Sequence, residues 1–197
     1  EMQAMQFRRT FASVRAANLF LSQGDHRAAG ELFDLIRPFD PARVAARELS
    51  ANIRFGDADA AARMLEERKD AAGDDFDCWS LVVAARRKLA IDSARFAEEC
   101  SDSFESPSHY ALAGDLDGAY REMDAMLPEL AGLADLPILF GSDMVAVRAD
   151  PRFFPLARKM GLVDYWRETD QWPDFCFEPS PGFDCKERAA SAPAAAP

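Results

Sequence analysis

Apolar residues recur every three or four positions along most of the chain, a period that is typical of helices. The clearest run flanks Gly24, with apolar side chains at Phe7, Phe11, Val14 and Leu21 before it and at Ala28, Ala29, Leu32, Phe33 and Ile36 after it. No segment alternates apolar and polar residues over the length of a strand. The pattern therefore predicts an all-α fold built from antiparallel helix pairs.

Three Gly-Asp dipeptides separate the apolar stretches, at Gly24-Asp25, Gly56-Asp57 and Gly114-Asp115. Glycine can close a helix in the left-handed conformation, and aspartate can accept hydrogen bonds from the N–H groups that open the next helix. The first two glycines are 32 residues apart and the last two 58, so one more turn is expected, near residues 90–92. Ser106-Pro107 is expected to cap the short helix that follows. The sequence thus predicts about four helical hairpins, with a period of about 34 residues.

The period and the packing residues resemble those of the tetratricopeptide repeat (TPR) family. Matching positions are Ala17, Phe20, Ala29, Phe33, Ile36 and Pro41 in the first repeat, and Tyr110, Gly114, Ala119, Met123 and Met126 in the fourth. The second repeat has Asn52 where the family usually has an aromatic residue, and the third lacks the turn glycine. The resemblance implies a right-handed TPR-like solenoid over residues 1–135, in which each hairpin buries its apolar face against its neighbours.

The C-terminal part of the chain carries an ordered series of short motifs, ALAGDLDGAY at 111–120, VRADPRFF at 147–154, MGLVDYW at 160–166 and WPDFC at 172–176. This succession resembles the C-terminal end of the repeat regions in bacterial modular signalling proteins, chiefly winged-helix transcriptional regulators and class III adenylate cyclases. It implies a helical C-terminal cap over residues 136–178. A Pro- and Ala-rich tail follows at 179–197, and about its last ten residues are expected to be disordered.

These resemblances imply a non-catalytic module that binds a protein or peptide partner or senses a signal. A free-standing scaffold or assembly subunit is the alternative. In the TPR family the first helix of each pair lines the concave surface, and the matching residues here are Asn18, Arg43, Ser50, Arg54 and Lys88. Cationic side chains in an acidic protein favour an acidic peptide or a C-terminal carboxylate as the ligand.

Composition and motifs exclude several other classes. A net charge of −11 and a pI of about 4.7 disfavour direct nucleic-acid binding, which needs clustered cations. No apolar run approaches the roughly 18 residues of a membrane span, although an anchor upstream of this chain is compatible with the sequence. His26 and His109 are expected at the surface or at helix ends and have no metal-ligand spacing, so no metal site is predicted. The chain also lacks phosphate-binding loops and nucleophile elbows, and we expect neither a cofactor nor an enzyme.

Aromatic residues of the predicted cap allow two interpretations. Trp166, Trp172 and Phe175 are expected to pack in a core, as most aromatic clusters do, and an aromatic ligand cage is the alternative.

The four cysteines suggest two disulfides. A turn near residue 91 places Cys100 within about one helical turn of Cys78, and Cys176 and Cys185 flank a Pro-Gly loop that closes readily. For Cys78 and Cys100, a role as small buried hydrophobes is the alternative. Because disulfides persist in oxidising compartments, the bridges would favour a periplasmic location over a cytoplasmic one.

Overall fold

The computed structural model describes residues 13, 14, 16, 17, 19–21, 25–101, 105–127, 139–177 and 182–191. Within these ranges every regular element is a helix and no strand occurs, so the all-α prediction is confirmed. The α-helices are α2 (His26–Ile36), α3 (Pro41–Phe55), α4 (Ala58–Glu67), α5 (Lys69–Ala72), α6 (Phe76–Arg86), α7 (Ser93–Cys100), α8 (Ser106–Ala113), α9 (Leu116–Met126), α10 (Val145–Ala149), α11 (Phe153–Lys159), α12 (Leu162–Thr169) and α13 (Cys185–Ser191). Short 3-10 helices are η1 (Gly73–Asp75), η4 (Ser142–Met144) and η5 (Asp174–Cys176).

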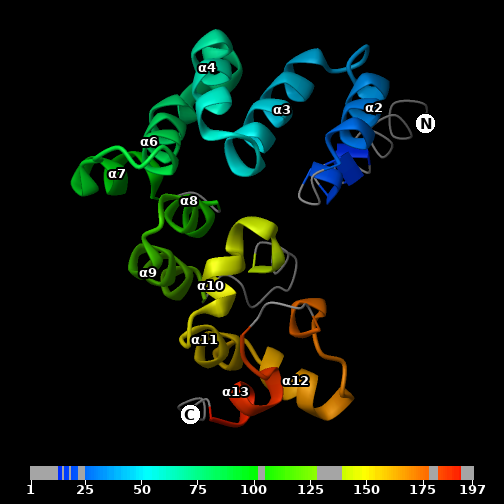
Figure 1. Ribbon diagram of the computed structural model, residues 1–197, viewed down its shortest axis with the longest axis vertical. Helices are drawn as coiled ribbons and strands as arrows, with labels where there is room; N and C mark the ends of the chain where they lie inside the picture. Colours follow the sequence, from blue (N-terminus) through cyan, green and yellow to red (C-terminus); the bar gives the residue numbers. More distant parts are fainter. Residues whose placement is uncertain are drawn as a thin grey trace.

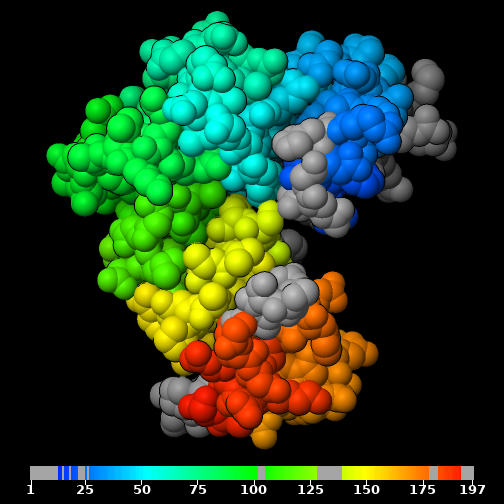
Figure 2. Space-filling model, viewed as in Figure 1, coloured from blue at the N-terminus to red at the C-terminus, as the bar shows by residue number. Residues whose placement is uncertain are grey.

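The helices follow one another along an open arc, from α2 at one end to α12 and α13 at the other (Figure 1). The space-filling view shows the same arc as an indented outline, with the N-terminal helices and the C-terminal helices on either side of the indentation (Figure 2). The predicted boundary between residues 135 and 136 lies outside the described residues.

The predicted aspartate caps are confirmed at all three joints. Asp25, Asp57 and Asp115 each accept a hydrogen bond from the backbone N–H three residues further on, at 3.0, 2.8 and 2.9 Å. These bonds satisfy donors that would otherwise lack a partner at the start of α2, α4 and α9. The same side-chain chemistry therefore sets where three helices begin.

The prediction for the glycines holds at one joint and is wrong at another. Gly114 closes α8 in the left-handed conformation, with φ of 81°. Gly56 instead has φ of −81° and ψ of −178°, an extended conformation open to any residue. A side chain is excluded there because an added Cβ would lie 2.7 Å from the Asn52 carbonyl oxygen. Gly24 lies outside the described residues.

The third turn lies where the spacing predicted it. Helix α6 ends at Arg86 and α7 begins at Ser93. Asp92, which precedes α7, accepts hydrogen bonds from the Ala94 and Arg95 N–H groups. The predicted cap at Ser106 is wrong by one residue, because Ser106 is already the first residue of α8. The predictions of a third helix pair and of a short α8 are therefore correct, but α8 begins one residue earlier than predicted.

Helix α3 is buried on two opposite sides. Val44 and Ala51 belong to the N-terminal apolar cluster that also holds residues of α2. Leu49 and Ile53 belong to the larger cluster that α4, α6 and later helices share. At about 100° per residue the two pairs point in nearly opposite directions from the helix axis. Figure 1 shows α3 between α2 and α4, so α3 joins successive layers of the arc.

The C-terminal helices pack around Phe153 and Phe154, which are almost fully buried. Gly161 separates α11 from α12 in the left-handed conformation, with φ of 75°. The prediction of a disordered tail is wrong for residues 188–191, because they form the second half of α13. Ala189 of that helix is fully buried, and its carbonyl accepts a hydrogen bond from Arg158 on α11. Residues 192–197 lie outside the described residues.

Candidate functional site

Only some of the predicted partner-binding residues lie together in the structure. Arg43, Ser50 and Arg54 lie along one face of α3, since they are seven and four residues apart. Arg43 pairs with Asp40 at 2.8 Å and keeps about half of its side chain exposed. Lys88 lies on another element, in the turn after α6. Asn18 lies outside the described residues.

Arg54 has a different environment from Arg43, because its guanidinium is bound inside the protein. One terminal nitrogen lies 3.0 Å from an Asp143 oxygen and the other 2.5 Å from a Glu105 oxygen. Ser108 also donates to Asp143, at 2.5 Å, and the guanidinium carbon lies 5.7 Å from the centre of the Trp79 ring. The Arg54 side chain is 16% exposed, and its charge is shared between the buried Asp143 carboxylate and the Glu105 carboxylate, which is 39% exposed.

His109 lies beside this ion-pair network in the first turn of α8. Of the two positions expected from the sequence, the helix end is therefore correct and the surface is wrong, because the side chain is buried. Burial lowers the pKa of His109 to about 4, and the positive charge of Arg54 acts in the same direction. Glu105 lies 3.9 Å from Nε2, and the Trp79 ring packs edge-on against the imidazole at 4.6 Å between centres. The imidazole is therefore neutral at pH 7 and is held in a fixed orientation.

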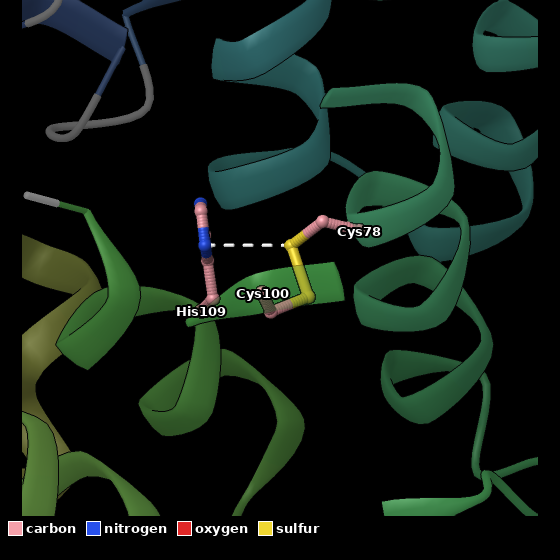
Figure 3. Close-up of side chains that lie close together, drawn as sticks. All are labelled: Cys78, Cys100 and His109. Carbon is pink, nitrogen blue, oxygen red and sulfur yellow. Dashed lines mark hydrogen bonds between the residues drawn. A yellow bond between two sulfur atoms is a disulfide. The ribbon is translucent and has the colours of Figure 1, made fainter. Parts of the chain in front are cut away.

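Both predicted cysteine pairs lie at disulfide distance. Cys78 and Cys100 join the start of α6 to the end of α7, and Cys176 and Cys185 join η5 to α13. Cys78 and Cys100 are also buried, but their sulfur atoms lie at bonding distance, which favours the disulfide over the alternative of two unpaired buried cysteines. Figure 3 shows the His109 ring beside the first bridge, with Nδ1 at 3.4 Å from the Cys78 sulfur.

Non-reducing peptide mapping of protein isolated with blocked thiols is expected to find Cys176 linked to Cys185. Their sequence separation of nine closes a short loop, which stabilises the folded state by about 2 to 3 kcal/mol on the loop-entropy model. Cys176→Ala with Cys185→Ala should lower the free energy of unfolding by that amount without reductant, and should make no difference after reduction. Recovery of both cysteines in alkylated form would contradict the bridge.

A pocket of about 210 Å³ opens between the helical residues near Leu21 and helices α2, α3 and α4. Its lining combines apolar and polar side chains, from Leu21, Ala29, Gly30, Phe33, Glu48, Asn52, Met64 and Arg68. On α3, Glu48 and Asn52 are about 140° and 180° around the axis from Arg43. The pocket therefore lies on the side of α3 opposite the predicted stripe.

The polar side of the pocket is held by hydrogen bonds. Glu48 accepts from Arg37 at 2.6 Å and from Arg68 at 3.0 Å. Burial alone would raise the pKa of Glu48, but these two hydrogen bonds outweigh it and hold the pKa below 4.5. The Asn52 amide donates to the Glu48 carbonyl at 2.7 Å, which fixes its side chain and leaves its oxygen as an acceptor. The Glu48 carboxylate and the Asn52 amide are therefore held in fixed positions beside the apolar residues of the pocket lining.

Gly30 is the unusual residue of this lining, because it lies in the interior of α2. An interior glycine costs about 0.5 to 1 kcal/mol relative to alanine. An added Cβ would meet no atom within 4 Å, so packing against the described residues does not require a glycine here. The space above Gly30 is part of the pocket, and glycine lets a ligand approach the helix backbone closely.

Two other hollows make weaker sites. The larger, of about 490 Å³, lies on the charged outer side of α4, and five of its six lining residues are Asp, Glu or Arg. The second, of about 370 Å³, borders the Cys176–Cys185 bridge and includes Trp172. The alternative of an aromatic cage is not supported, because Trp166 and Phe175 are buried against Phe154 and Phe153.

Several residues of these sites were missed from the sequence. The network around Arg54 draws on Glu105 and Asp143, which lie 51 and 89 positions away in the chain. No local motif links such distant residues. Gly30 could have been noticed, because a glycine in the interior of a predicted helix lowers its stability and therefore calls for a packing or functional reason.

Among the described residues, no helix is long and apolar enough to cross a membrane. Comparison of the chain with known protein families, with curated proteins and with solved structures gives no match.

Proposed function

We propose that this chain is a non-catalytic module that binds a protein or peptide partner, built as a TPR-like right-handed solenoid. The burial of α3 on two opposite sides supports stacked hairpins, because each helix pair of a solenoid packs on the pair before it and the pair after it. The open arc of helices is the shape that such stacking produces (Figure 1).

The pocket between α2, α3 and α4 is the observation that carries the proposal. Its volume of about 210 Å³ is below the roughly 300 to 1,000 Å³ of typical small-molecule sites. It suits one apolar anchor side chain of a partner. Gly30 gives that partner access to the α2 backbone, and the Asn52 oxygen can accept from a peptide N–H.

The arginine stripe on α3 is a weaker binding surface than the sequence suggested. Arg54 already pairs with the carboxylates of Asp143 and Glu105, so an acidic peptide would have to compete with them. Arg43 remains half exposed and paired only with Asp40 among the described residues. We therefore place the main anchor in the pocket and leave Arg43, which lies on the opposite side of α3, out of the proposed site.

Substitution of Gly30 tests the pocket. Peptides selected from a random displayed library on the wild-type protein should bind at least about 30-fold more weakly to Gly30→Phe, since an excluded anchor side chain typically costs 2 kcal/mol or more. Gly30→Ala is the matched control, because its single methyl group fits the open space and leaves most of the pocket free. Calorimetry on purified protein measures both affinities.

Two outcomes would count against the site. A Gly30→Phe variant that binds the selected peptides as tightly as the wild type would move the site elsewhere on the arc. Failure of the library to yield any peptide that binds the wild type specifically would argue against peptide recognition altogether.

The signalling role rests on the resemblance of the C-terminal motifs to bacterial modular signalling proteins. A free-standing scaffold or assembly subunit would use the same pocket and is the second candidate. A winged-helix, cyclase or membrane-spanning segment elsewhere in the same gene product would favour the signalling role. The two cysteine pairs at disulfide distance support a periplasmic location over a cytoplasmic one, since such bonds persist in oxidising compartments.

A further inference from the structure

Three potential metal ligands converge where α6, α7 and α8 meet. The sulfur atoms of Cys78 and Cys100 and an imidazole nitrogen of His109 all lie within 4.8 Å of one another. All three side chains are buried, and each comes from a different helix (Figure 3). We propose that, when the Cys78–Cys100 bridge is reduced, these residues bind one thiophilic d10 cation, Zn²⁺ or Cu⁺.

The distance between His109 and Cys78 fits such a cation, and the two sulfur atoms, which are bonded to each other in the bridge, must move apart after reduction to act as separate ligands. With metal–sulfur and metal–nitrogen bonds of about 2.3 and 2.0 Å, two ligands of a tetrahedral site lie about 3.5 Å apart. Nδ1 of His109 lies 3.4 Å from the Cys78 sulfur. Thiolate and imidazole donors are the set that favours zinc and monovalent copper over oxygen-preferring cations.

The surroundings of His109 resemble those of a metal ligand in part. Metal-bound histidines usually donate their second ring N–H to a carboxylate or carbonyl, which fixes the tautomer. Here Nε2 has no hydrogen-bond partner among the described residues, and the nearest carboxylate is that of Glu105 at 3.9 Å, which is held in turn by Arg54. Binding through Nδ1 places the ring proton on Nε2, toward that carboxylate. Trp79 packs against the ring and limits its rotation.

Disulfide and metal forms exclude one another, because each uses the same two sulfur atoms. Reduction by a dithiol transfers two electrons and two protons to the bridge and leaves the dithiol oxidised to its own disulfide. Cation binding then releases the two thiol protons as the thiolates coordinate. Three protein donors suffice for Cu⁺, whereas Zn²⁺ would take a water molecule as its fourth ligand.

Metal titration of the full chain, under anaerobic conditions, tests the inference. Reduced wild-type protein should bind one equivalent of Zn²⁺ or of Cu⁺, and Co²⁺ as a spectroscopic substitute for zinc should show thiolate charge-transfer bands. Oxidised wild-type protein should bind no metal ion, and this control requires no amino-acid substitution. Cys176→Ser with Cys185→Ser is the matched control and should keep the site, while Cys78→Ser with Cys100→Ser should abolish it.

His109→Gln tests the third ligand and should weaken binding by more than the roughly 10- to 100-fold that loss of an outer partner costs. His26→Gln is its control and should bind as the wild type does. The proposal is overturned if reduced wild-type protein takes up neither cation, if the Cys78 and Cys100 variant retains the site, or if His109→Gln leaves the affinity unchanged.

Discussion

Replacement of Arg54 by Met is expected to lower the free energy of unfolding by about 3 to 5 kcal/mol, the usual cost of removing one partner from a buried ion pair. Asp143 is only 5% exposed, and its charge would then lie beside Glu105 with no guanidinium between them. Methionine keeps much of the side-chain volume, so the loss would come mainly from the uncompensated carboxylates. Urea titration followed by circular dichroism measures it.

Arg43→Met is the matched control, because Arg43 lies on the same face of the same helix. Its ion pair with Asp40 is half exposed, and such pairs contribute about 0 to 1 kcal/mol. Adding Asp143→Asn to Arg54→Met should restore part of the lost stability, because it removes one of the stranded charges. Equal effects of the two arginine replacements would show that the network around Arg54 is not a buried ion pair.

The helical architecture could be predicted from the sequence because its signals are local. An aspartate cap needs only its own side chain and an N–H three residues on, and Asp25, Asp57 and Asp115 all follow that rule. Helix α13 was missed because its support is not local. It is held by the bridge from Cys176 and by the contact of Ala189 with α11, neither of which its Ala-rich sequence reveals.

The candidate sites were less predictable, because they depend on which segments meet. Arg54 was assigned to partner binding from its place on α3, and that place is correct. Its partners come from the residue before α8 and from η4, so the sequence could not show that its charge is already bound. Likewise, the pairing of Cys78 with Cys100 follows from one hairpin turn, whereas the approach of His109 depends on how α8 packs against α6.

The stability of the protein is expected to fall by about 3 kcal/mol as the pH decreases from 6.5 to 4, because of His109. The unfolded chain binds a proton on this imidazole with a pKa near 6.5, whereas burial lowers the pKa in the folded state to about 4. Between these values the unfolded state holds more protons, so acid favours unfolding there. Above about pH 7.5 both states are neutral at this residue, and it adds no pH dependence.

His109→Gln should remove this slope, and His26→Gln, which replaces the other histidine of the chain, is measured beside it as a second reference. Asp75, whose pKa is raised by burial, contributes with the opposite sign, but it is present in both variants and cancels in the comparison. Glu48 and Asp150 have lowered pKa values, so the stability that their carboxylates contribute to the fold is lost mainly below the pH range in which His109 acts. Chemical unfolding of the three proteins at several pH values between 4 and 7 measures the slopes. Parallel curves for the wild type and His109→Gln would mean that the imidazole is not buried in the neutral form, and the charge network around it would have to be arranged differently.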